Sequence, residues 1–388
     1  MLIKRREKRI MKILVSAESF GYGPITTGLN IVKELKKYND VKLDFIGSGI
    51  AMEQAKMSGY FENYYLCDTY DFMSLEKSKS IFEKYHIFLS SENVNGAIFA
   101  LKNGIKNTYY VDNLMWMWDK IPDGLLTVKK YFISEIIPSK ENFNKIGKKI
   151  LNPIFVGPVR KIEVKKCSTK NQIIINLGGA ESFLLEHSLI VDFYNKLLNE
   201  ILSTELVNSF DSIIICGGSG VINSIKLKKS SKKIKKCTLS HEAYLLEMER
   251  SSHCILASGL GNFIETVGKY KNIMYLPAIN YSQLQQLEYY KKQNFGFKAL
   301  NWDNFEFYKQ IPKFLDEETG VNLVVLNIKE YLKNDYTEKV SKVVKEFLVE
   351  KQDAFFETRK DYINNFSKSA SSDIAKTIYT ENKGGEDE

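Results

Sequence analysis

The stretch "SGLGNFIETVGKYKNIMYLPAINYSQLQQ", residues 258–286, decides the fold. It follows the apolar run "HCILA", which predicts a buried strand, and it opens with a glycine turn. A helical pattern then leads to a second apolar run, "IMYLP", which is followed by another helical pattern that is rich in glutamine. This order of strand, glycine turn, helix and strand is typical of a parallel sheet whose faces are covered by helices.

The same alternation fills the rest of the chain. The second half adds the strand patterns "QIIINLGG" and "DSIIICGGSG", and the first half contains "KILVS", "KLDFIGSG", "NYYLCD", "HIFLSS", "NTYYVDN", "KYFIS" and "PIFVG". The polar, lysine-rich stretch "VGPVRKIEVKKCSTKN" interrupts the alternation between the halves. We therefore predict an α/β protein with two tandem doubly wound domains at 11–158 and 171–335, a linker at 159–170, and C-terminal helices at 336–380.

Composition narrows the class of protein. A chain of 388 residues with 44% hydrophobic and 26% charged residues is expected to be soluble, with two or three domains. The five cysteines form no C-x-x-C pair, so neither a disulfide framework nor a zinc site is indicated. No apolar run approaches the ~20 residues of a membrane span, and the basic N-terminus lacks the pattern of a secretory signal. These features predict a cytoplasmic location.

The net charge of +8 is concentrated in "KRREKR" near the N-terminus and in "KLKKSSKKIKK" at 226–236. A lysine-dense stretch is compatible with peripheral contact at the inner, anionic face of a membrane. The alternative is a solvated loop or edge strand. The chain shows no basic motif with interleaved aromatic residues, so no nucleic-acid partner is expected.

Three strands of the second half end in glycine-rich turns: "NLGGAES", "CGGSG" and "ASGLGN". Open parallel sheets bind ligands beyond the carboxyl ends of their strands. Glycine there lets the backbone approach a ligand, and the following helix presents amide groups to a phosphate or diphosphate. The alternative is that these glycines only close tight turns. The predicted contacts are Gly178, Gly179, Gly218, Ser258, Gly259, Gly261 and Asn262.

Familiar phosphate and metal motifs are incomplete in this chain. "GPITTGLN" has Leu29 and Asn30 where a P-loop needs lysine and a hydroxyl residue. "GYGPIT" and "GLGNFI" have Thr26 and Ile264 where the dinucleotide motif needs its third glycine, which disfavours a redox cofactor. "HEAYL" lacks the second histidine of the zinc motif, and no internal D-x-D pair is present. The sequence therefore predicts no metal site.

Polar residues lie in the two helical patterns that follow the turn "SGLGN". Glu265 lies one turn inside the predicted helix, where its carboxylate is able to accept hydrogen bonds from two vicinal hydroxyls, as on a ribose. Gln283, Gln285 and Gln286 offer both donors and acceptors, which suits the hydroxyls of a sugar. The alternative for Glu265 is a solvated helix carboxylate.

Together these patterns resemble the GT-B glycosyltransferases, especially the group that contains the peptidoglycan N-acetylglucosaminyltransferase and the UDP-glycosyltransferases. The resemblance implies two Rossmann-like domains with a cleft between them and final helices that return to the N-terminal domain. It implies that the loop with Leu239 contacts the base, that "SGLGN" receives the diphosphate and that Glu265 binds the ribose. Either Ser282 with Gln283, or Gln285 with Gln286, would hold the donor sugar, and the resemblance leaves this register open.

The resemblance also implies a reaction. A sugar would move from a nucleotide-diphosphate sugar, with UDP favoured, to a hydroxyl-bearing small molecule or glycan bound on the N-terminal domain. Amides and a helix dipole would stabilise the leaving diphosphate without a metal or other cofactor, and the transfer would be inverting. Two alternatives on the same fold are a nucleotide-sugar epimerase or hydrolase, and an inactive subunit that only binds the sugar nucleotide.

The first glycine turn, "GYGPITTG", departs from this family. Its members often carry a histidine base in this turn, and Pro24 stands at that place here. A proline accepts no proton, so this turn is expected to shape the acceptor side, with Gly21 and Gly23 giving clearance.

A base is therefore expected elsewhere on the N-terminal domain. Asp112 and Glu18 each follow a predicted strand, and we rank Asp112 first and Glu18 second. Trp116 and Trp118 lie close to Asp112 in the sequence and are candidates for stacking on the acceptor. The alternative for both tryptophans is a place in the core.

Overall fold

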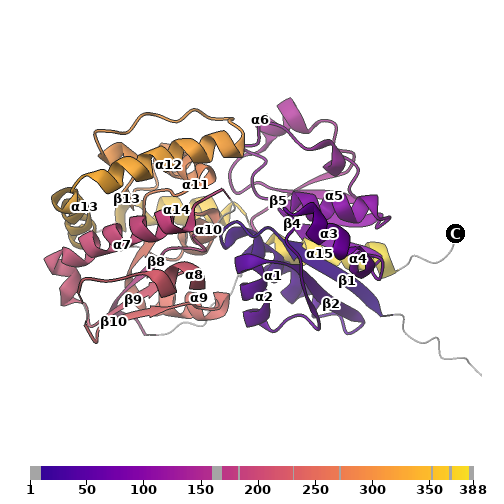
Figure 1. Cartoon of the computed structure of the whole chain (residues 1–388), viewed down its shortest axis with the longest axis horizontal. Coiled ribbons are helices and arrows are strands. Elements are labelled where there is room, and N and C mark those ends of the chain that lie inside the picture. The colour runs from indigo at the N-terminus through magenta and orange to yellow at the C-terminus, as the bar shows by residue number, and fades with distance from the viewer. Residues whose placement is uncertain are drawn as a thin grey trace, which may run out of the picture.

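The structure is a computed structural model, and it describes residues 10–159, 168–181, 184–229, 231–270, 272–350, 353–366 and 369–383. It consists of two α/β domains that lie side by side, with the N-terminal domain in indigo and purple (Figure 1). Most of the predicted linker, residues 160–167, lies outside the described residues.

The N-terminal domain is built on one sheet of parallel strands in the order β3-β2-β1-β4-β5-β6-β7. Its strands are β1 (Met11–Ala17), β2 (Val41–Gly47), β3 (Tyr64–Leu66), β4 (Ile87–Ser91), β5 (Asn107–Asp112), β6 (Lys130–Ser134) and β7 (Pro153–Val156). Its helices are α1 (Gly23–Leu35), α2 (Gly49–Ser58), α3 (Phe72–Lys77), α4 (Lys79–Phe82), α5 (Val94–Lys102) and α6 (Lys140–Asn142).

The C-terminal sheet repeats this strand order as β10-β9-β8-β11-β12-β13, again with parallel neighbours. Its strands are β8 (Lys170–Asn176), β9 (Ser212–Cys216), β10 (Ile234–Cys237), β11 (Ser251–Leu256), β12 (Ile273–Tyr275) and β13 (Lys298–Ala299). Its helices are α7 (His187–Ser203), α8 (Ser219–Ser224), α9 (His241–Arg250), α10 (Leu260–Thr266), α11 (Tyr281–Lys292) and α12 (Glu317–Lys333). The prediction of two doubly wound α/β domains is confirmed.

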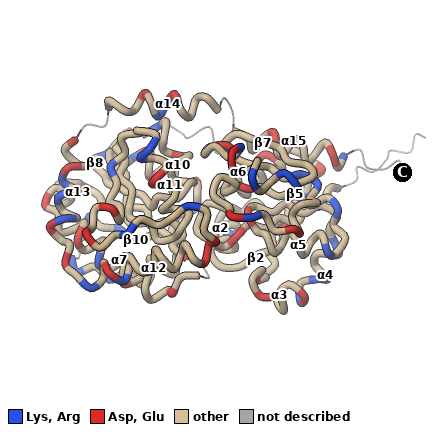
Figure 2. Tube along the Cα trace, turned by 90° about the horizontal axis from the view of Figure 1, so that it is seen from above, with Lys and Arg blue, Asp and Glu red and all other residues tan. Residues whose placement is uncertain are grey.

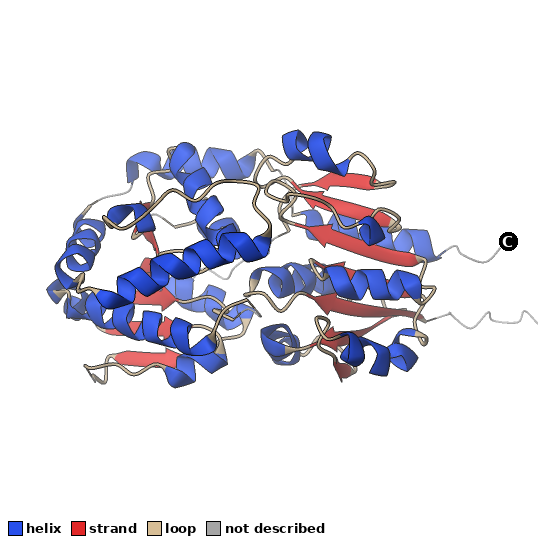
Figure 3. Ribbon diagram, turned by 45° about the horizontal axis from the view of Figure 1, so that its top comes forward, coloured by secondary structure: helices blue, strands red, loops and turns tan. Residues whose placement is uncertain are grey.

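In both sheets the order of the strands reverses at one place, between β1 and β4 and between β8 and β11. At such a switch point the connections leave in opposite directions, and a crevice opens beyond the carboxyl ends of the strands. The arrowheads of the N-terminal strands point toward the other domain (Figure 3). The two switch points therefore face the region where the domains meet.

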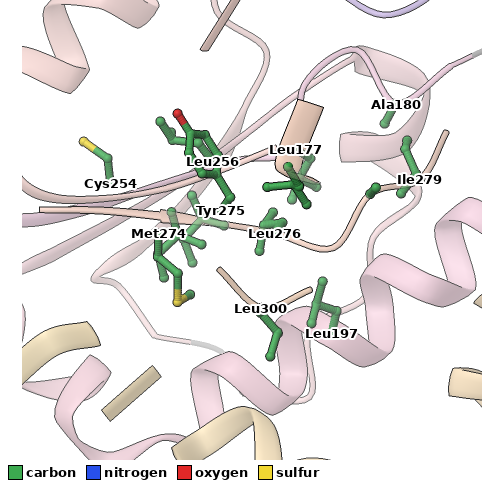
Figure 4. Close-up of a cluster of buried hydrophobic side chains, with 14 of the residues drawn as sticks. Leu177, Ala180, Leu197, Cys254, Leu256, Met274, Tyr275, Leu276, Ile279 and Leu300 are labelled. Atoms are coloured by element: carbon green, nitrogen blue, oxygen red, sulfur yellow. The ribbon is translucent and has the colours of Figure 1, made fainter. Parts of the chain in front are cut away.

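The C-terminal turns rest on a dense apolar layer. Leu177, Leu256, Leu276 and Ile279 lie at or just beyond the ends of their strands, and all are buried (Figure 4). Strands β8 and β9 also carry continuous isoleucine runs, as expected for strands that are covered on both faces. Each fully buried side chain of this size contributes about 1.5–3 kcal/mol, so the floor beneath the glycine turns is firmly held.

The last helices divide between the domains. Helix α13 (Thr337–Val349) packs on α7, and α14 (Phe356–Asn364) lies against C-terminal aromatic side chains, with Tyr362 contacting Phe295. Helix α15 (Ala370–Lys383), drawn in yellow, lies beside the N-terminal domain (Figure 1). There Tyr379 stacks on Tyr38 with 3.8 Å between ring centroids and donates a hydrogen bond to Asp40.

This packing predicts that α15 stabilises the N-terminal domain. Ile378 on α15 is fully buried in the N-terminal core, so Ile378→Ala should lower the free energy of unfolding by about 2–5 kcal/mol. Urea unfolding followed by tryptophan fluorescence measures the change. Lys376→Ala, at an exposed position of the same helix, is the control, and equal losses in both variants would contradict the assignment.

Candidate functional site

One cavity spans the two switch points and takes residues from both domains. Its N-terminal wall consists of Phe20, Gly21, Tyr22, Gly23, Pro24, Thr26, Thr27, Gln54, Glu92, Asn113, Leu114 and Val159. Its C-terminal wall consists of Asn176, Gly178, Gly179, Cys216, Gly217, Leu239, His241, Tyr244, Ala257, Gly259, Leu260, Gly261, Asn262, Ile264, Glu265, Asn280, Ser282, Gln283 and Gln286. Among these described residues there is no lysine or arginine.

The predicted glycine turns form much of the C-terminal wall. A Cβ atom at Gly259 or Gly261 would meet no atom within 4 Å, so the backbone there opens directly onto the cavity. Gly178 has a φ of 69°, which glycine adopts without strain. Gly218 does not line the cavity, and its amide donates to the Gly178 carbonyl at 3.0 Å. Ser258 is also outside the lining and fully buried.

A polar network fixes the wall beside the "SGLGN" turn. Asn262 donates to the carbonyl of Ala257 at 2.8 Å, and its Oδ1 accepts from Tyr244 and from Asn176, at 2.7 and 3.1 Å. Asn176 in turn accepts from the Gly178 amide at 2.9 Å. Because the bond from Asn176 to Asn262 joins the glycine turns after β8 and β11, these two turns are held together without a ligand.

Glu265 lies in this wall with one carboxylate oxygen unused. Its side chain is almost fully buried, and Oε1 lies 3.4 Å from Nε2 of His241. Its Oε2 lies 3.9 Å from the Lys269 ammonium but makes no hydrogen bond among the described residues. A buried carboxylate oxygen without a donor is costly, and a ligand hydroxyl in the cavity would supply that donor.

The three glutamines of α11 differ in what they face. Gln286 is 2% exposed, lines the cavity, and its Oε1 receives no hydrogen bond from any described residue. Gln285 is equally buried but lies outside the lining and donates to the Pro312 carbonyl at 3.3 Å. Gln283 lines the cavity and also caps the helix, because its Oε1 accepts from the Ile279 amide at 3.0 Å.

The predicted acceptor turn forms part of the opposite wall. Gly21, Gly23 and Pro24 all line the cavity. The Gly21 amide donates to the Glu181 carbonyl of the C-terminal domain at 3.2 Å. A Cβ on Gly179 would lie 2.8 Å from the Gly21 Cα, so the backbones of the two domains touch here.

Asp112 and the two tryptophans lie behind this wall. Asp112 is fully buried and accepts from Tyr131 at 2.7 Å, from the Leu114 amide and from the Trp118 indole. Trp116 is 8% exposed and belongs to a core cluster made largely of C-terminal residues. None of these three side chains lines the cavity, and the bonds to Asp112 explain why the buried aspartate is tolerated.

Glu18 faces a second, neighbouring cavity with Asp68, Tyr70 and Glu181 among its lining residues. Its carboxylate accepts from the Ser19 amide at 2.7 Å. Burial is the main cause that raises the pKa of Glu18 to about 7. The structure therefore separates both predicted bases from the cavity that contains Glu265.

A third carboxylate, absent from the sequence-based candidates, does face that cavity. Glu92 directly follows β4, has a left-handed φ of 59° and accepts a hydrogen bond from the Asn113 amide nitrogen. Desolvation by burial is the largest cause that raises the pKa of Glu92 to about 8. The rule that ligands bind beyond strand ends, applied to "IFLSS" and "NTYYVD", would have found Glu92 and Asn113.

The lysine-dense stretch lies at the edge of the C-terminal sheet, where β10 is the outer strand. Lys236 donates to the Ile225 carbonyl at 2.6 Å and Lys233 to the Phe210 carbonyl at 3.2 Å. Lysines on an edge strand discourage further strand pairing, and charges of both signs are interspersed over both domains (Figure 2). Contact with an anionic membrane stays a prediction.

In the described part of the chain, no helix combines the length and apolar character that crossing a membrane requires. No group of three or more histidine, cysteine, aspartate or glutamate side chains in the same residues is arranged to hold a metal ion.

The raised pKa of Glu92 predicts how pH acts on stability. The folded protein keeps this proton up to about pH 8, whereas the unfolded chain releases it near pH 4.5, so stability falls as pH rises between these values. Glu92→Gln removes this loss. Its melting temperature minus that of the wild type should therefore be larger at pH 8.5 than at pH 5.

Thermal melts at the two pH values measure this difference, and Glu83→Gln, at an exposed position, is the matched control. A difference that is flat with pH for Glu92→Gln, or equal in both variants, would contradict the burial of this carboxyl.

Comparison with known proteins places this architecture. No protein-family model matches the sequence, and no curated protein matches it. Among solved structures, MurG from Acinetobacter baumannii is 10% identical, covering 96% of this chain and 99% of its own, with a TM-score of 0.52. S. aureus MnaA in a co-structure with UDP is 12% identical, covering 98% and 99%, with a TM-score of 0.55. A UDP-N-acetylglucosamine 2-epimerase is 12% identical, covering 96% and 95%, with a TM-score of 0.50. Likeness at such identities shows the fold, and the chain therefore has the GT-B fold that its sequence pattern resembles.

Proposed function

We propose that this protein is a glycosyltransferase that takes a sugar from a nucleotide-diphosphate sugar, with UDP as the favoured nucleotide. The sugar would pass to a hydroxyl-bearing acceptor in the cavity between the domains. Structures of the same fold include glycosyltransferases and a complex with UDP, which supports the choice of donor.

One observation carries the proposal. Two side chains on neighbouring helices, Glu265 and Gln286, are almost fully buried, line one cavity, and each has an oxygen without a hydrogen bond among the described residues. An unpaired buried polar atom costs about 1–3 kcal/mol. A ligand rich in hydroxyls that enters this cavity would remove both costs, and a sugar nucleotide has such hydroxyls on its ribose and on its sugar.

The donor would lie along the C-terminal wall, and each of its parts would contact a different group of residues there. The loop with Leu239 would contact the base, and Glu265 with its neighbour His241 would hold the ribose. The open backbone at Gly259 and Gly261 would receive the diphosphate through amide groups. Gln286, with Gln283 beside it, would contact the donor sugar.

Because no lysine or arginine lies among the described residues that line the cavity, amide groups would carry the charge of the leaving diphosphate. Fixed donors of this kind stabilise developing charge without reorganisation. We propose that the reaction needs no metal ion and inverts the anomeric centre, since the base acts from the wall opposite the diphosphate.

For the base we propose Glu92 in place of Asp112 and Glu18. Glu92 lines the same cavity as the donor-side residues, whereas the oxygens of Asp112 are occupied by Tyr131, Trp118 and the Leu114 amide. A pKa of about 8 is close to working pH, which is where a general base acts most effectively. Asn113 holds the carboxylate from the side.

Calorimetry with UDP and a UDP-sugar tests the donor wall. Glu265→Ala removes hydrogen bonds to a charged group, worth about 1.5–3 kcal/mol, so affinity for UDP should fall roughly 10- to 100-fold. Glu357→Ala, at an exposed position of α14, should bind as the wild type does. Equal affinity in both variants would contradict the proposal.

Variants of two adjacent glutamines distinguish binding of the donor sugar from binding of the nucleotide. Gln286→Ala should weaken the binding of the UDP-sugar by about 2- to 10-fold, from the loss of one neutral hydrogen bond, and leave the binding of UDP unchanged. Gln285→Ala should change neither, because Gln285 faces the Pro312 carbonyl. An effect of Gln285→Ala as large as that of Gln286→Ala would overturn the assignment of the sugar subsite.

A further inference from the structure

On the wall opposite the donor-side residues, two hydrogen-bond acceptors, Glu92 and Asn113, lie close together. Their arrangement indicates which nucleophile the cavity holds. Glu92 follows β4 and Asn113 follows β5, so their side chains lie beside each other at the carboxyl edge of the N-terminal sheet. Thr27 of α1 lies next to them, and all three line the cavity. The inference drawn from this group rests on the donor site of the proposed function, and it puts water in the place of a larger hydroxyl-bearing acceptor.

The hydrogen bonds of Asn113 are fully accounted for on one side of its amide. An amide nitrogen has two hydrogens, and Nδ2 donates one to Glu92 Oε1 and one to Thr27 Oγ1, the latter at 3.1 Å. Oδ1 belongs to a residue that is 4% exposed, and it receives no hydrogen bond among the described residues.

The group that completes this arrangement must donate twice. One hydrogen goes to the Glu92 carboxylate, which acts as base, and one goes to Asn113 Oδ1. A single hydroxyl of an alcohol has one hydrogen to give, whereas a water molecule has two. The two acceptors, Glu92 and Asn113 Oδ1, therefore match the two hydrogens of one water molecule. An alcohol would need a second donor elsewhere in the acceptor to satisfy both.

The N-terminal lining adds few polar side chains to this group. Phe20, Pro24, Leu114 and Val159 are apolar, and the further polar side chains are those of Tyr22, Thr26 and Gln54, of which Gln54 already donates to the Leu239 carbonyl at 3.2 Å. A glycan acceptor is recognised by polar groups that pair with its several hydroxyls.

The cleft is also closed where these walls meet. The Gly21 amide donates to the Glu181 carbonyl across the domains. A Cβ on Gly179 would lie 2.4 Å from Ile50 Cδ1, which leaves no space for a side chain there.

We propose that the nucleophile is water, held between Glu92 and Asn113, and that the protein hydrolyses its sugar nucleotide. The water oxygen bonds to the anomeric carbon while the bond from that carbon to the phosphate oxygen breaks. The electron pair leaves with the nucleoside diphosphate, and the water proton passes to Glu92 and then to solvent. One sugar nucleotide and one water give one free sugar, one nucleoside diphosphate and one proton.

The first test uses the wild-type protein, no acceptor, and UDP-glucose, UDP-galactose and UDP-N-acetylglucosamine as probes in ¹⁸O-labelled water. Release of UDP and free sugar is expected from at least one probe. The UDP should carry no ¹⁸O, because the bond from carbon to oxygen breaks. Label in the UDP, or release only when an alcohol acceptor is added, would overturn the proposal.

Calorimetry with the same UDP-sugars measures donor binding separately from hydrolysis. Binding without release in water would overturn hydrolysis and leave the donor site standing. The absence of both binding and release would overturn the proposed function as well.

Variants test the two residues that hold the water. Glu92→Gln should slow UDP release by about 10²- to 10⁴-fold, the usual contribution of a general base, while UDP affinity stays the same. Asn113→Ala should also slow release. It should in addition move the ascending limb of the pH–rate profile to higher pH, because the hydrogen bond from Asn113 lowers the pKa of Glu92, which must lose its proton to act as base.

Asp112 and Glu18 also act on Glu92, and both raise its pKa, but neither is altered in these variants. Asn103→Ala is the matched control, because Asn103 only caps α5 through the Phe99 carbonyl. Unchanged release and an unchanged pH limb in Asn113→Ala would overturn the role of Asn113. If that variant does not fold, the ¹⁸O experiment on the wild type still decides the proposal.

Discussion

The structure depends on the close approach of three turns whose backbones meet at glycine residues. A Cβ on Gly218 would lie 2.2 Å from the Gly179 carbonyl oxygen, and a Cβ on Gly179 would lie 2.8 Å from the Cα of Gly21. Contacts this short exclude any larger residue. The glycines therefore let the two C-terminal turns bond to each other and let the first turn of the N-terminal domain rest on them. The cavity exists because these turns meet there.

The electrostatics of the cavity follow from this closure. Two carboxylates line opposite walls of the cavity: Glu92 lies on the N-terminal wall and Glu265 on the C-terminal wall. Many of the groups between them are apolar. Desolvation raises the pKa of Glu92, while Glu265 has His241 and Lys269 within 4 Å. One wall thus holds a group suited to moving a proton, and the other holds a group suited to accepting hydroxyls. These two groups would suit the proposed reaction at a sugar carbon, which needs a base and a site that binds hydroxyls.

The sequence predicted the C-terminal wall better than the N-terminal one, for physical reasons. The strand patterns and glycine turns are local, so the rule that ligands lie beyond strand ends predicts "SGLGN" and Glu265 from the sequence. The role of Asp112 depends on Tyr131 and Trp118, which close over it only in the folded protein. The direction in which the Glu92 side chain points depends on its left-handed φ, which no local sequence pattern predicts. The placement of α13 on the C-terminal domain and of α15 on the N-terminal domain likewise depends on the tertiary surfaces against which these helices pack.

Hydrogen–deuterium exchange with and without saturating UDP tests the central claim that the switch-point cavity is the nucleotide site. If UDP binds in this cavity, exchange should slow in residues 257–266 and 279–286 and stay unchanged in α13, which packs on α7 away from the cavity. Unchanged exchange in 257–266, with protection elsewhere or nowhere, would contradict it.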